Sequence, residues 1–317
     1  RFESYEKMLS DTLFENLMLM FLSVFLFKIC MKKSFFPLVL CLLPLCNVFA
    51  QAPIHYKQPA RNWNEALPVG NGRLGVMTFG RVNEELLQLN EETLWSGGPV
   101  EKNPNPDAIK HLPAVREALK REEYETASKE LQKIQGLYTE AYQPLGDLLI
   151  KQPFDAQPSA YFRDLDLQNA TAHTQFTIEG VTYIRELFVS APDQVIVLRL
   201  TASQKGKLNF SASTKSPHPL LKQITGKNEL SMRGKAPAHA DPNYVNYNAK
   251  PVYYEDPSGC KGMRFDWRVK VQTTDGKVTA DTSGLSISNA TEAILLITAA
   301  TSFNGFDKCP DSQGRDE

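Results

Sequence analysis

Short segments in which apolar and polar residues alternate dominate the chain from residue 143 onward. The clearest has the apolar residues Met263, Phe265, Trp267, Val269 and Val271 interleaved with the charged residues Arg264, Asp266, Arg268 and Lys270. Successive side chains of a β-strand point to opposite faces of the sheet. The pattern therefore predicts a strand with one buried face and one hydrated face.

Similar segments recur along this half of the chain, with Gly, Pro, Asn and Asp turns between them. They cover residues 181–189, 195–200, 208–212, 285–287 and 293–297. Many short strands separated by turn residues favour antiparallel sheets over a parallel, helix-covered sheet. We therefore expect a mainly β fold, a large two-sheet antiparallel β-sandwich.

One region has helical periodicity instead and predicts a short helical insertion at about 105–135. Asn105 is suited to cap a helix, Pro106 suits a first turn, and Gly136 suits the end of the insertion. Apolar residues recur at helical spacing in two runs, Ile109, Leu112, Val115 and Leu119, then Tyr124, Ala127, Leu131 and Ile134. We expect two helices packed outside the sandwich.

The first fifty residues are expected to lie outside the fold. Residues 31–50 have a charged start, an apolar run at 35–45 and small residues ending at Ala50, as in a secretory signal peptide. Cleavage after Ala50 would send the chain to a bacterial periplasm or exterior, with no stable membrane insertion afterwards. Residues 1–30 are expected to be an upstream reading-frame extension, with a second membrane-directed segment as the alternative.

Charge and cysteine content limit the partners. The 35 basic and 36 acidic side chains nearly cancel, so no charge excess attracts nucleic acid or an anionic membrane, and a neutral sugar fits better. Cys260 and Cys309 are the cysteines of the exported part. Export would allow them to pair, and two free thiols are the alternative. The five histidines are scattered without metal-ligand spacing, so neither a metal nor another cofactor is expected.

The stretch 63–99 is rich in glycine and aromatic residues. Gly70, Gly72 and Gly75 satisfy G-x-G-x-x-G, a spacing found in dinucleotide-binding loops. Such a loop works only when a helix opens on its last glycine and points its N-terminus at the pyrophosphate. The β-forming residues 76–79 follow here, so we reject a nucleotide site.

This stretch resembles the N-terminal signature of glycoside hydrolase family 95, the inverting α-L-fucosidases and related α-galactosidases. The resemblance continues through residues 142–147, 163–167, 183–188, 193–197 and 300–306. It implies an N-terminal super-sandwich domain, whereas the family's catalytic glutamic acid, aspartate and asparagine lie in a downstream (α/α)6 barrel. No such barrel precedes Glu317, so we expect a partial chain and assign it no catalytic residue.

The residues themselves also argue against catalysis in this part. A glycosidase needs two carboxyl groups that flank the scissile bond. Glu91 and Glu92 are adjacent, and adjacent residues of an extended segment point to opposite sides. A loop-anchoring role is therefore expected for Glu91.

Two groups of residues are the site candidates. The first is expected to face the barrel near its substrate cleft, and its members are Asn90, Glu91, Thr93, Trp95 and Ser96. The alternative is a self-contained turn with Trp95 buried in the sandwich. The second group lies in irregular loops and consists of His218, His239 and Tyr244, where rings and amides nearby suit a sugar. An ordinary long connection is the alternative there.

Three functions are compatible with these observations. The favoured one is the non-catalytic N-terminal domain of a secreted α-L-fucosidase-like hydrolase, which reaches its oligosaccharide substrate through the barrel. The second is a free-standing carbohydrate-binding module with an exposed aromatic platform. The third is a structural or interaction domain without a sugar site.

Overall fold

The computed structural model describes residues 54–136, 139–224, 226–244 and 248–316. The chain divides into two compact units, Arg1–Ala52 and Pro53–Glu317. All of the first unit lies outside the described residues, and the predicted upstream extension and signal peptide lie there with it.

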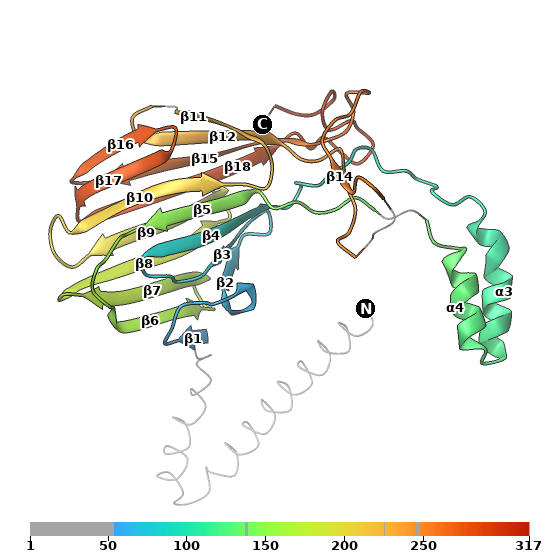
Figure 1. Ribbon diagram of the computed structural model, residues 1–317, viewed down its shortest axis with the longest axis horizontal. Helices are drawn as coiled ribbons and strands as arrows, with labels where there is room; N and C mark the ends of the chain where they lie inside the picture. Colours follow the sequence, from blue (N-terminus) through green and yellow to red (C-terminus); the bar gives the residue numbers. More distant parts are fainter. Residues whose placement is uncertain (1–53, 137–138, 225, 245–247, 317) are drawn as a thin grey trace, which may run out of the picture. The chain divides into compact units, whose positions relative to one another are not determined.

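A nine-stranded sheet forms one layer of the second unit (Figure 1). Its strands, in spatial order, are β1 (Ile54–Tyr56), β6 (Ser159–Asp166), β7 (Thr171–Ile178), β8 (Val181–Ser190), β9 (Val195–Ala202), β18 (Glu292–Thr301), β15 (Arg264–Thr273), β12 (Glu229–Lys235) and β11 (Leu220–Ile224). Four consecutive strands, β6 to β9, are joined by tight turns, whereas β1 and β18 reach the sheet from distant parts of the sequence.

A seven-stranded sheet forms the second layer. Its order is β16 (Lys277–Asp281), β17 (Gly284–Ala290), β10 (Leu208–Lys215), β5 (Gly146–Lys151), β4 (Glu84–Glu91), β3 (Leu74–Thr78) and β2 (Leu67–Gly70). A small sheet pairs β13 (His239–Ala240) with β14 (Val252–Tyr253). Every strand pairing in the described part of the chain is antiparallel, which confirms the predicted two-sheet antiparallel sandwich.

The core lies between the two large sheets. One cluster of buried apolar side chains includes Trp267 and Phe265 from the first sheet and Leu87, Leu148 and Phe210 from the second. The alternating apolar residues predicted around β15 are all buried, because each points from the pleated strand toward the facing sheet. Alternation along the sequence is thus sufficient to place this strand correctly.

One position on the outer face of β15 differs from the prediction of a hydrated face. Asp266 is buried. Its carboxylate lies beneath two arginines, with Arg233 Nε at 2.7 Å and Arg268 Nε at 3.2 Å, and it accepts a hydrogen bond from Ser231. The long arginine side chains cover the carboxylate and satisfy it, so a charged residue is removed from water without being left unpaired.

The predicted insertion contains two helices, α3 (Ala108–Lys120) and α4 (Tyr124–Gln132). The predicted capping role of Asn105 is wrong, because Asp107 occupies the N-cap position of α3. The Asn105 amide instead donates to the carbonyls of Lys133 at 2.8 Å and Gln135 at 2.9 Å. It therefore closes the base of the hairpin by bonding the end that follows α4.

The apolar stripes of this hairpin are only partly buried. The helices pack chiefly against each other, through Val115, Ala118 and Ala127. The outer members of the predicted stripes, Ile109, Leu119, Tyr124 and Leu131, are exposed. The helical periodicity thus predicted both helices correctly. Fewer of the apolar residues are buried between the two helices than the periodicity suggested.

Candidate functional site

The glycine-rich signature forms the β2–β3 hairpin and the strand β4 that follows it. In the hairpin turn, the Asn71 side-chain oxygen accepts from the backbone N–H groups of Arg73 at 3.0 Å and Leu74 at 2.8 Å. Gly72 adopts the positive φ of 94° that this turn requires. Strand β3 follows directly where a dinucleotide-binding loop would open a helix. The G-x-G-x-x-G spacing here is therefore a property of a hairpin turn.

Glu91, the last residue of β4, anchors the loop that follows. Its side chain is buried and lies 3.3 Å from Arg73 Nη1. Its other oxygen accepts from Thr93 N at 2.7 Å and Thr93 Oγ1 at 2.6 Å. Thr93 Oγ1 in turn contacts Thr301 Oγ1, at the end of β18. The carboxylate is fully engaged in holding the loop, while the neighbouring Glu92 points to solvent.

Residues 95–100 run through the centre of a cluster of loops. Ser96 N donates to Ala141 O at 2.9 Å, Gly97 N donates to Pro237 O at 3.0 Å, and Val100 N donates to Phe306 O at 2.9 Å. Gly262 N donates back to Gly97 O at 2.7 Å. Four loops that are distant in sequence are thus tied to residues 95–100. We call this segment and the four loops together the loop cluster.

Glycine is required at the middle of this segment. Gly97 has a φ of 85°, and a Cβ there would lie 2.2 Å from Glu140 Cγ. A Cβ on Gly98 would lie 3.0 Å from Lys261 Cγ. The glycine-rich end of the signature therefore allows close approach between backbone and neighbouring loops.

Trp95 and Tyr142 form an exposed aromatic pair on the loop cluster. Their rings meet edge to face with centroids 5.4 Å apart, and about two fifths of each residue is exposed, 44% and 40%. Trp95 Nε1 donates to Glu92 O at 3.1 Å, and Tyr142 Oη donates to Glu91 O at 3.0 Å. Trp95 is therefore fixed at the surface, and the alternative of a tryptophan buried in the sandwich is wrong.

Asn90 lies at the edge of this pair. Its amide donates to Tyr142 Oη at 3.2 Å. Burial raises the pKa of the Tyr142 phenol, and the hydrogen bond from Asn90 opposes that shift. The phenol therefore stays protonated at neutral pH and continues to donate to the β4 end.

Ser96 and His239, predicted as members of separate groups, are brought together by Glu140. Ser96 Oγ donates to Glu140 Oε2 at 2.6 Å, and His239 Nδ1 lies 2.9 Å from Glu140 Oε1. His239 Nε2 lies 3.0 Å from Asp241 Oδ1, and the Asn248 amide donates to the other Asp241 oxygen at 2.6 Å. The hydrogen bond with Glu140 raises the pKa of His239, with Asp241 adding to the effect and partial burial opposing it.

His218 has a different environment. It is buried, with Nε2 3.0 Å from the carbonyl oxygen of Pro144 and Nδ1 3.2 Å from Tyr254 Oη. Because a carbonyl can only accept, Nε2 carries the proton, and Nδ1 accepts from the tyrosine. Burial lowers the pKa of His218. This histidine is a neutral packing residue beneath the loops.

The two histidines contact neighbouring tyrosines at the end of β14. The His239 ring lies 5.3 Å from that of Tyr253, and the His218 ring lies 6.3 Å from that of Tyr254. Tyr244 lies beside the undescribed residues 245–247 and is 72% exposed. Thus His239 belongs to the hydrogen-bond network of Ser96, Glu140 and Asp241. His218 is buried beneath the loops, and Tyr244 is exposed.

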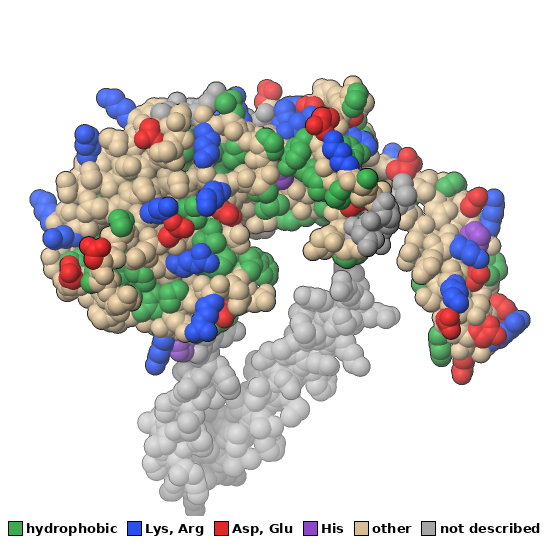
Figure 2. Space-filling model, in the orientation of Figure 1, with side chains coloured by type: hydrophobic (Ala, Val, Ile, Leu, Met, Phe, Trp, Pro, Cys, Tyr) green, Lys and Arg blue, Asp and Glu red, His purple; other side chains and the backbone are tan. Residues whose placement is uncertain are grey.

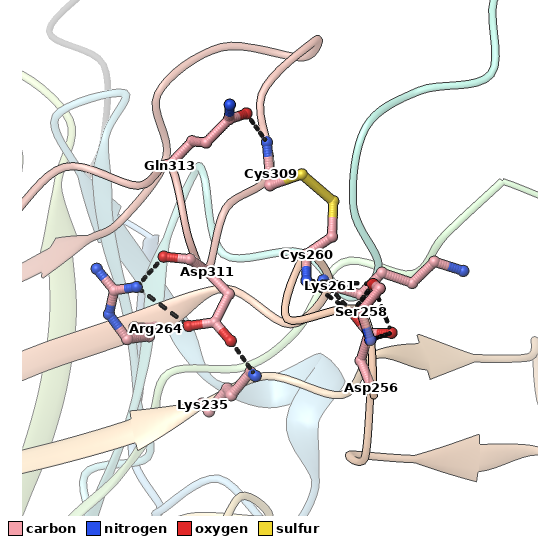
Figure 3. The surroundings of a disulfide bond; sticks show 9 residues. All are labelled: Lys235, Asp256, Ser258, Cys260, Lys261, Arg264, Cys309, Asp311 and Gln313. Atoms are coloured by element: carbon pink, nitrogen blue, oxygen red, sulfur yellow. Dashed lines mark hydrogen bonds and ion pairs between the residues drawn. A yellow bond between two sulfur atoms is a disulfide. The ribbon is translucent and has the colours of Figure 1, made fainter.

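A disulfide closes the loop cluster on the side of the last strand (Figure 3). Cys260 and Cys309 are bonded across 49 residues of sequence. The alternative of two free thiols is therefore wrong. Asp256 accepts from the backbone N–H groups of Cys260 at 2.8 Å and Lys261 at 2.6 Å, so the approach to the bridge is ordered. Asp311 beyond it pairs with Lys235 at 2.6 Å and with Arg264.

The surface of this region mixes charge with apolar groups. Figure 2 shows hydrophobic side chains among both acidic and basic ones over the loops around β14. Exposed apolar residues of the loop cluster include Trp95, Tyr142, Val100 and Phe306. In the described part of the chain, no group of three or more His, Cys, Asp or Glu residues is arranged to hold a metal ion. None of the described helices has the length and apolar character needed to span a membrane.

The carboxylates of the loop cluster serve structural roles. Glu91, Glu140 and Asp241 each accept hydrogen bonds from at least two protein groups. A glycosidase acid must instead present its proton to a glycosidic oxygen, and its partner must reach water or the sugar carbon. The arrangement is suited to fixing an aromatic surface.

Sequence reasoning missed Glu140 and Tyr142 as partners of the signature. Tyr142 opens one of the matched segments, but nothing in the sequence pairs it with Trp95. Glu140 is an ordinary acidic residue in a loop, and its role depends on contacts across 44 residues to Ser96 and 99 residues to His239. Only the assembled fold could identify this network.

Comparison with known proteins gives the family of this chain. Residues 54–305 match the family described as "Glycosyl hydrolase family 65, N-terminal domain". The chain is 35% identical over 257 residues to "Alpha-L-fucosidase 2" of Arabidopsis thaliana, covering 78% of this chain and 30% of that protein. It is 32% identical over 210 residues to "Probable alpha-fucosidase A" of Aspergillus niger, covering 62% of this chain and 26% of that protein.

The chain thus spans less than a third of the length of these two curated relatives. A putative kojibiose phosphorylase from the human microbiome is a structural neighbour, with a TM-score of 0.44 and 7% identity over 78% of this chain and 32% of that one. The family match covers nearly all of the described residues and confirms the resemblance to the N-terminal domain of a glycoside hydrolase. This chain belongs to the family of glycosyl hydrolase family 65 N-terminal domains.

Proposed function

We propose that this chain is the non-catalytic N-terminal domain of a secreted α-L-fucosidase-like hydrolase that acts on fucosylated or related glycans. In this proposal a downstream catalytic barrel packs on the loop cluster, and the β-sandwich supports it. The observation that carries the proposal is the fixed, exposed pair of Trp95 and Tyr142 at the centre of four interlinked loops. The names of the curated relatives support the fucoside substrate class.

The loop cluster has the properties expected of an interface beside a sugar cleft. Trp95, Tyr142, Val100 and Phe306 offer apolar area, and aromatic residues are enriched in the centres of protein interfaces. Asn90 and Ser96 add amide and hydroxyl groups, which can bond sugar hydroxyls. Glu91 and Thr93 hold this surface in place from behind.

Export is supported by the covalent link between Cys260 and Cys309. Disulfides persist in oxidising compartments such as the bacterial periplasm or the cell exterior, and they are rare in the cytosol. The signal-peptide pattern at residues 31–50 supports the same location.

A free-standing carbohydrate-binding module is the second candidate, because the exposed Trp95–Tyr142 pair could itself serve as a sugar platform. The two candidates differ in their dependence on a catalytic partner. The domain proposal requires that residues 54–316, which keep Phe306 and the Cys260–Cys309 bridge, replace the corresponding domain of a full-length α-L-fucosidase relative and leave an active enzyme.

That replacement is the test, with hydrolysis of an aryl α-L-fucoside as the measurement. We expect turnover in the hybrid enzyme and a loss of about tenfold or more in kcat/KM when Trp95→Ala is introduced, because the substitution disturbs positioning near the cleft. Leu167→Ala, at an exposed apolar residue in the β6–β7 turn, is the control. A folded hybrid whose turnover and substrate affinity are unchanged by Trp95→Ala would refute the cleft assignment.

A further inference from the structure

The outer face of the nine-stranded sheet carries a second feature, separate from the loop cluster. A shallow depression of about 440 Å³ lies over β6 to β9. Its lining includes His173, Glu186, Phe188 and Arg199, together with Asp166 at the end of β6 and Asn169 in the β6–β7 turn.

A row of acidic and basic side chains crosses this face. Asp164, His173, Glu186 and Arg199 occupy directly opposed positions on four successive strands. Arg199 Nη1 lies 2.6 Å from Glu186 Oε2, and Arg199 Nε lies 3.0 Å from Glu292 Oε1. His173 lies between Asp164, at 3.5 Å, and Glu186, at 4.0 Å. The strand register and these contacts therefore fix the positions of the four side chains across the sheet.

An aromatic ring lies beside the charged row. Phe188 points outward from β8 and is 39% exposed. Val197 is directly opposite it on β9, and Leu296 is opposite Val197 on β18, and both are partly exposed. Side chains on the same face of neighbouring strands are close enough to form a continuous surface. Phe188 is thus the apolar side chain of the depression's lining, and the apolar strip continues beyond the depression through Val197 and Leu296.

The charges on this face disfavour an anionic ligand. Arg199 is neutralised by two glutamates, and His173 lies between two acids, so no unbalanced positive charge remains to hold an anion. Carboxylates accept hydrogen bonds from hydroxyl groups, and a guanidinium donates to hydroxyl oxygens. A pyranose offers an apolar face for a ring and hydroxyl groups at its edge, which matches Phe188 beside the charged row.

We propose that this depression binds a neutral glycan, with a pyranose stacked on Phe188 and its hydroxyl groups bonded to Glu186 and Arg199. The choice of a glycan rests on the proposed function, but the site is separate from the loop cluster and requires no catalytic partner. Its role is to hold a segment of polymeric or cell-surface glycan while chemistry occurs elsewhere.

The test is affinity electrophoresis of the full chain in native gels that contain a soluble polysaccharide. Xyloglucan and mannan serve as neutral probes, and polygalacturonate serves as the anionic probe. We expect retardation by at least one neutral probe and none by polygalacturonate. Phe188→Ala and Glu186→Gln should each weaken binding about tenfold or more.

Phe162→Ala is the matched control, because Phe162 has the same 39% exposure and points outward from β6, outside the depression. It should bind as the parent does. Phe188→Leu keeps apolar bulk, so it separates loss of the ring from loss of folding, and thermal unfolding checks each variant. Retardation that Phe188→Leu and Phe188→Ala leave unchanged would overturn the proposal, as would preferred binding of polygalacturonate or no binding of any neutral probe. None of these outcomes bears on fucoside hydrolysis by the hybrid enzyme.

Discussion

Single residues fix the exposed surface of the loop cluster. The signature supplies Glu91 and Trp95, but their roles follow from contacts to Arg73, Thr93 and Tyr142. The sequence could predict an anchoring role for Glu91, because adjacent glutamates cannot act on one bond. It could not predict the exposure of Trp95, because exposure depends on loops that come together only in the fold.

The buried pair of Arg185 and Glu85 should be the most sensitive charge pair in the sandwich. Arg185 Nη1 lies 3.0 Å from Glu85 Oε2, and both side chains are almost fully buried. Glu85→Gln would leave a buried guanidinium without its counter-charge, and we expect a loss of about 3–5 kcal/mol in the free energy of unfolding. Chemical denaturation measures this loss.

Glu84→Gln is the control for that measurement. Glu84 precedes Glu85 on β4 and pairs with Lys151 at 3.1 Å, but both partners are largely exposed. Exposed pairs contribute about 0–1 kcal/mol, so this variant should stay close to the parent. Equal effects at the two positions would contradict the assignment.

His239 should make the loop cluster more stable on the acidic side of neutrality. Its folded-state pKa is raised by Glu140, so its contribution is fully present below the unfolded pKa of about 6.5 and is lost as pH rises through the folded value. Asp241 has a lowered pKa, so its contribution is lost only in more acidic solution. The stability difference between the parent and His239→Gln should therefore be largest between about pH 5 and 6 and should shrink toward pH 8. A difference that grows with pH in thermal unfolding would refute this linkage.

At the scale of elements, periodic residue patterns predicted the strands and helices. The sequence did not predict which strands pair with each other. Strands such as β15 are encoded by alternation along a few residues, so local reasoning was sufficient. The pairing of β1 with β6 and of β18 with β9 joins segments far apart in the chain, and no local pattern specifies those partners. Asn105 shows the same limit, because a residue suited to cap α3 bonds instead to carbonyls beyond α4.

The loop cluster should depend on glycine at position 97 more than the β2–β3 turn depends on glycine at position 72. Both glycines have positive φ, but only at Gly97 would a Cβ collide with a neighbour, Glu140. Gly72→Ala should cost about 1–3 kcal/mol through backbone strain alone, and Gly97→Ala should cost more. Urea unfolding of the two variants compares them, and a smaller effect at Gly97 would contradict the proposed packing of these loops.

At the scale of the whole molecule, the domain combines a well-buried sandwich with a loop cluster held by hydrogen bonds and one covalent link. The two-sheet architecture was predictable from composition and alternation, because many short strands need a second layer to bury their apolar faces. The meeting of residues 95–100 with loops near 141, 237, 262 and 306 was not predictable, since it depends on the order of strands in both sheets.

The disulfide should contribute measurably to the stability of the whole domain. Joining Cys260 to Cys309 closes a long loop, so Cys260→Ala with Cys309→Ala should lower the free energy of unfolding by about 2–4 kcal/mol. Reduction of the parent protein should lower its thermal midpoint in the same direction. If neither treatment changes unfolding, the bridge does not stabilise the fold.

We propose that this domain supports catalysis without performing it. The most direct test is hydrolysis of an aryl α-L-fucoside by the chain alone, measured beside the parent carrying Glu91→Gln or Glu92→Gln, with all samples purified identically. We expect no turnover above buffer for any of the three proteins, because Glu91 is engaged in structural bonds and the adjacent, exposed Glu92 points to the opposite side of the segment. Reproducible hydrolysis by the parent that either substitution abolishes would contradict the account and place the catalytic site in this domain.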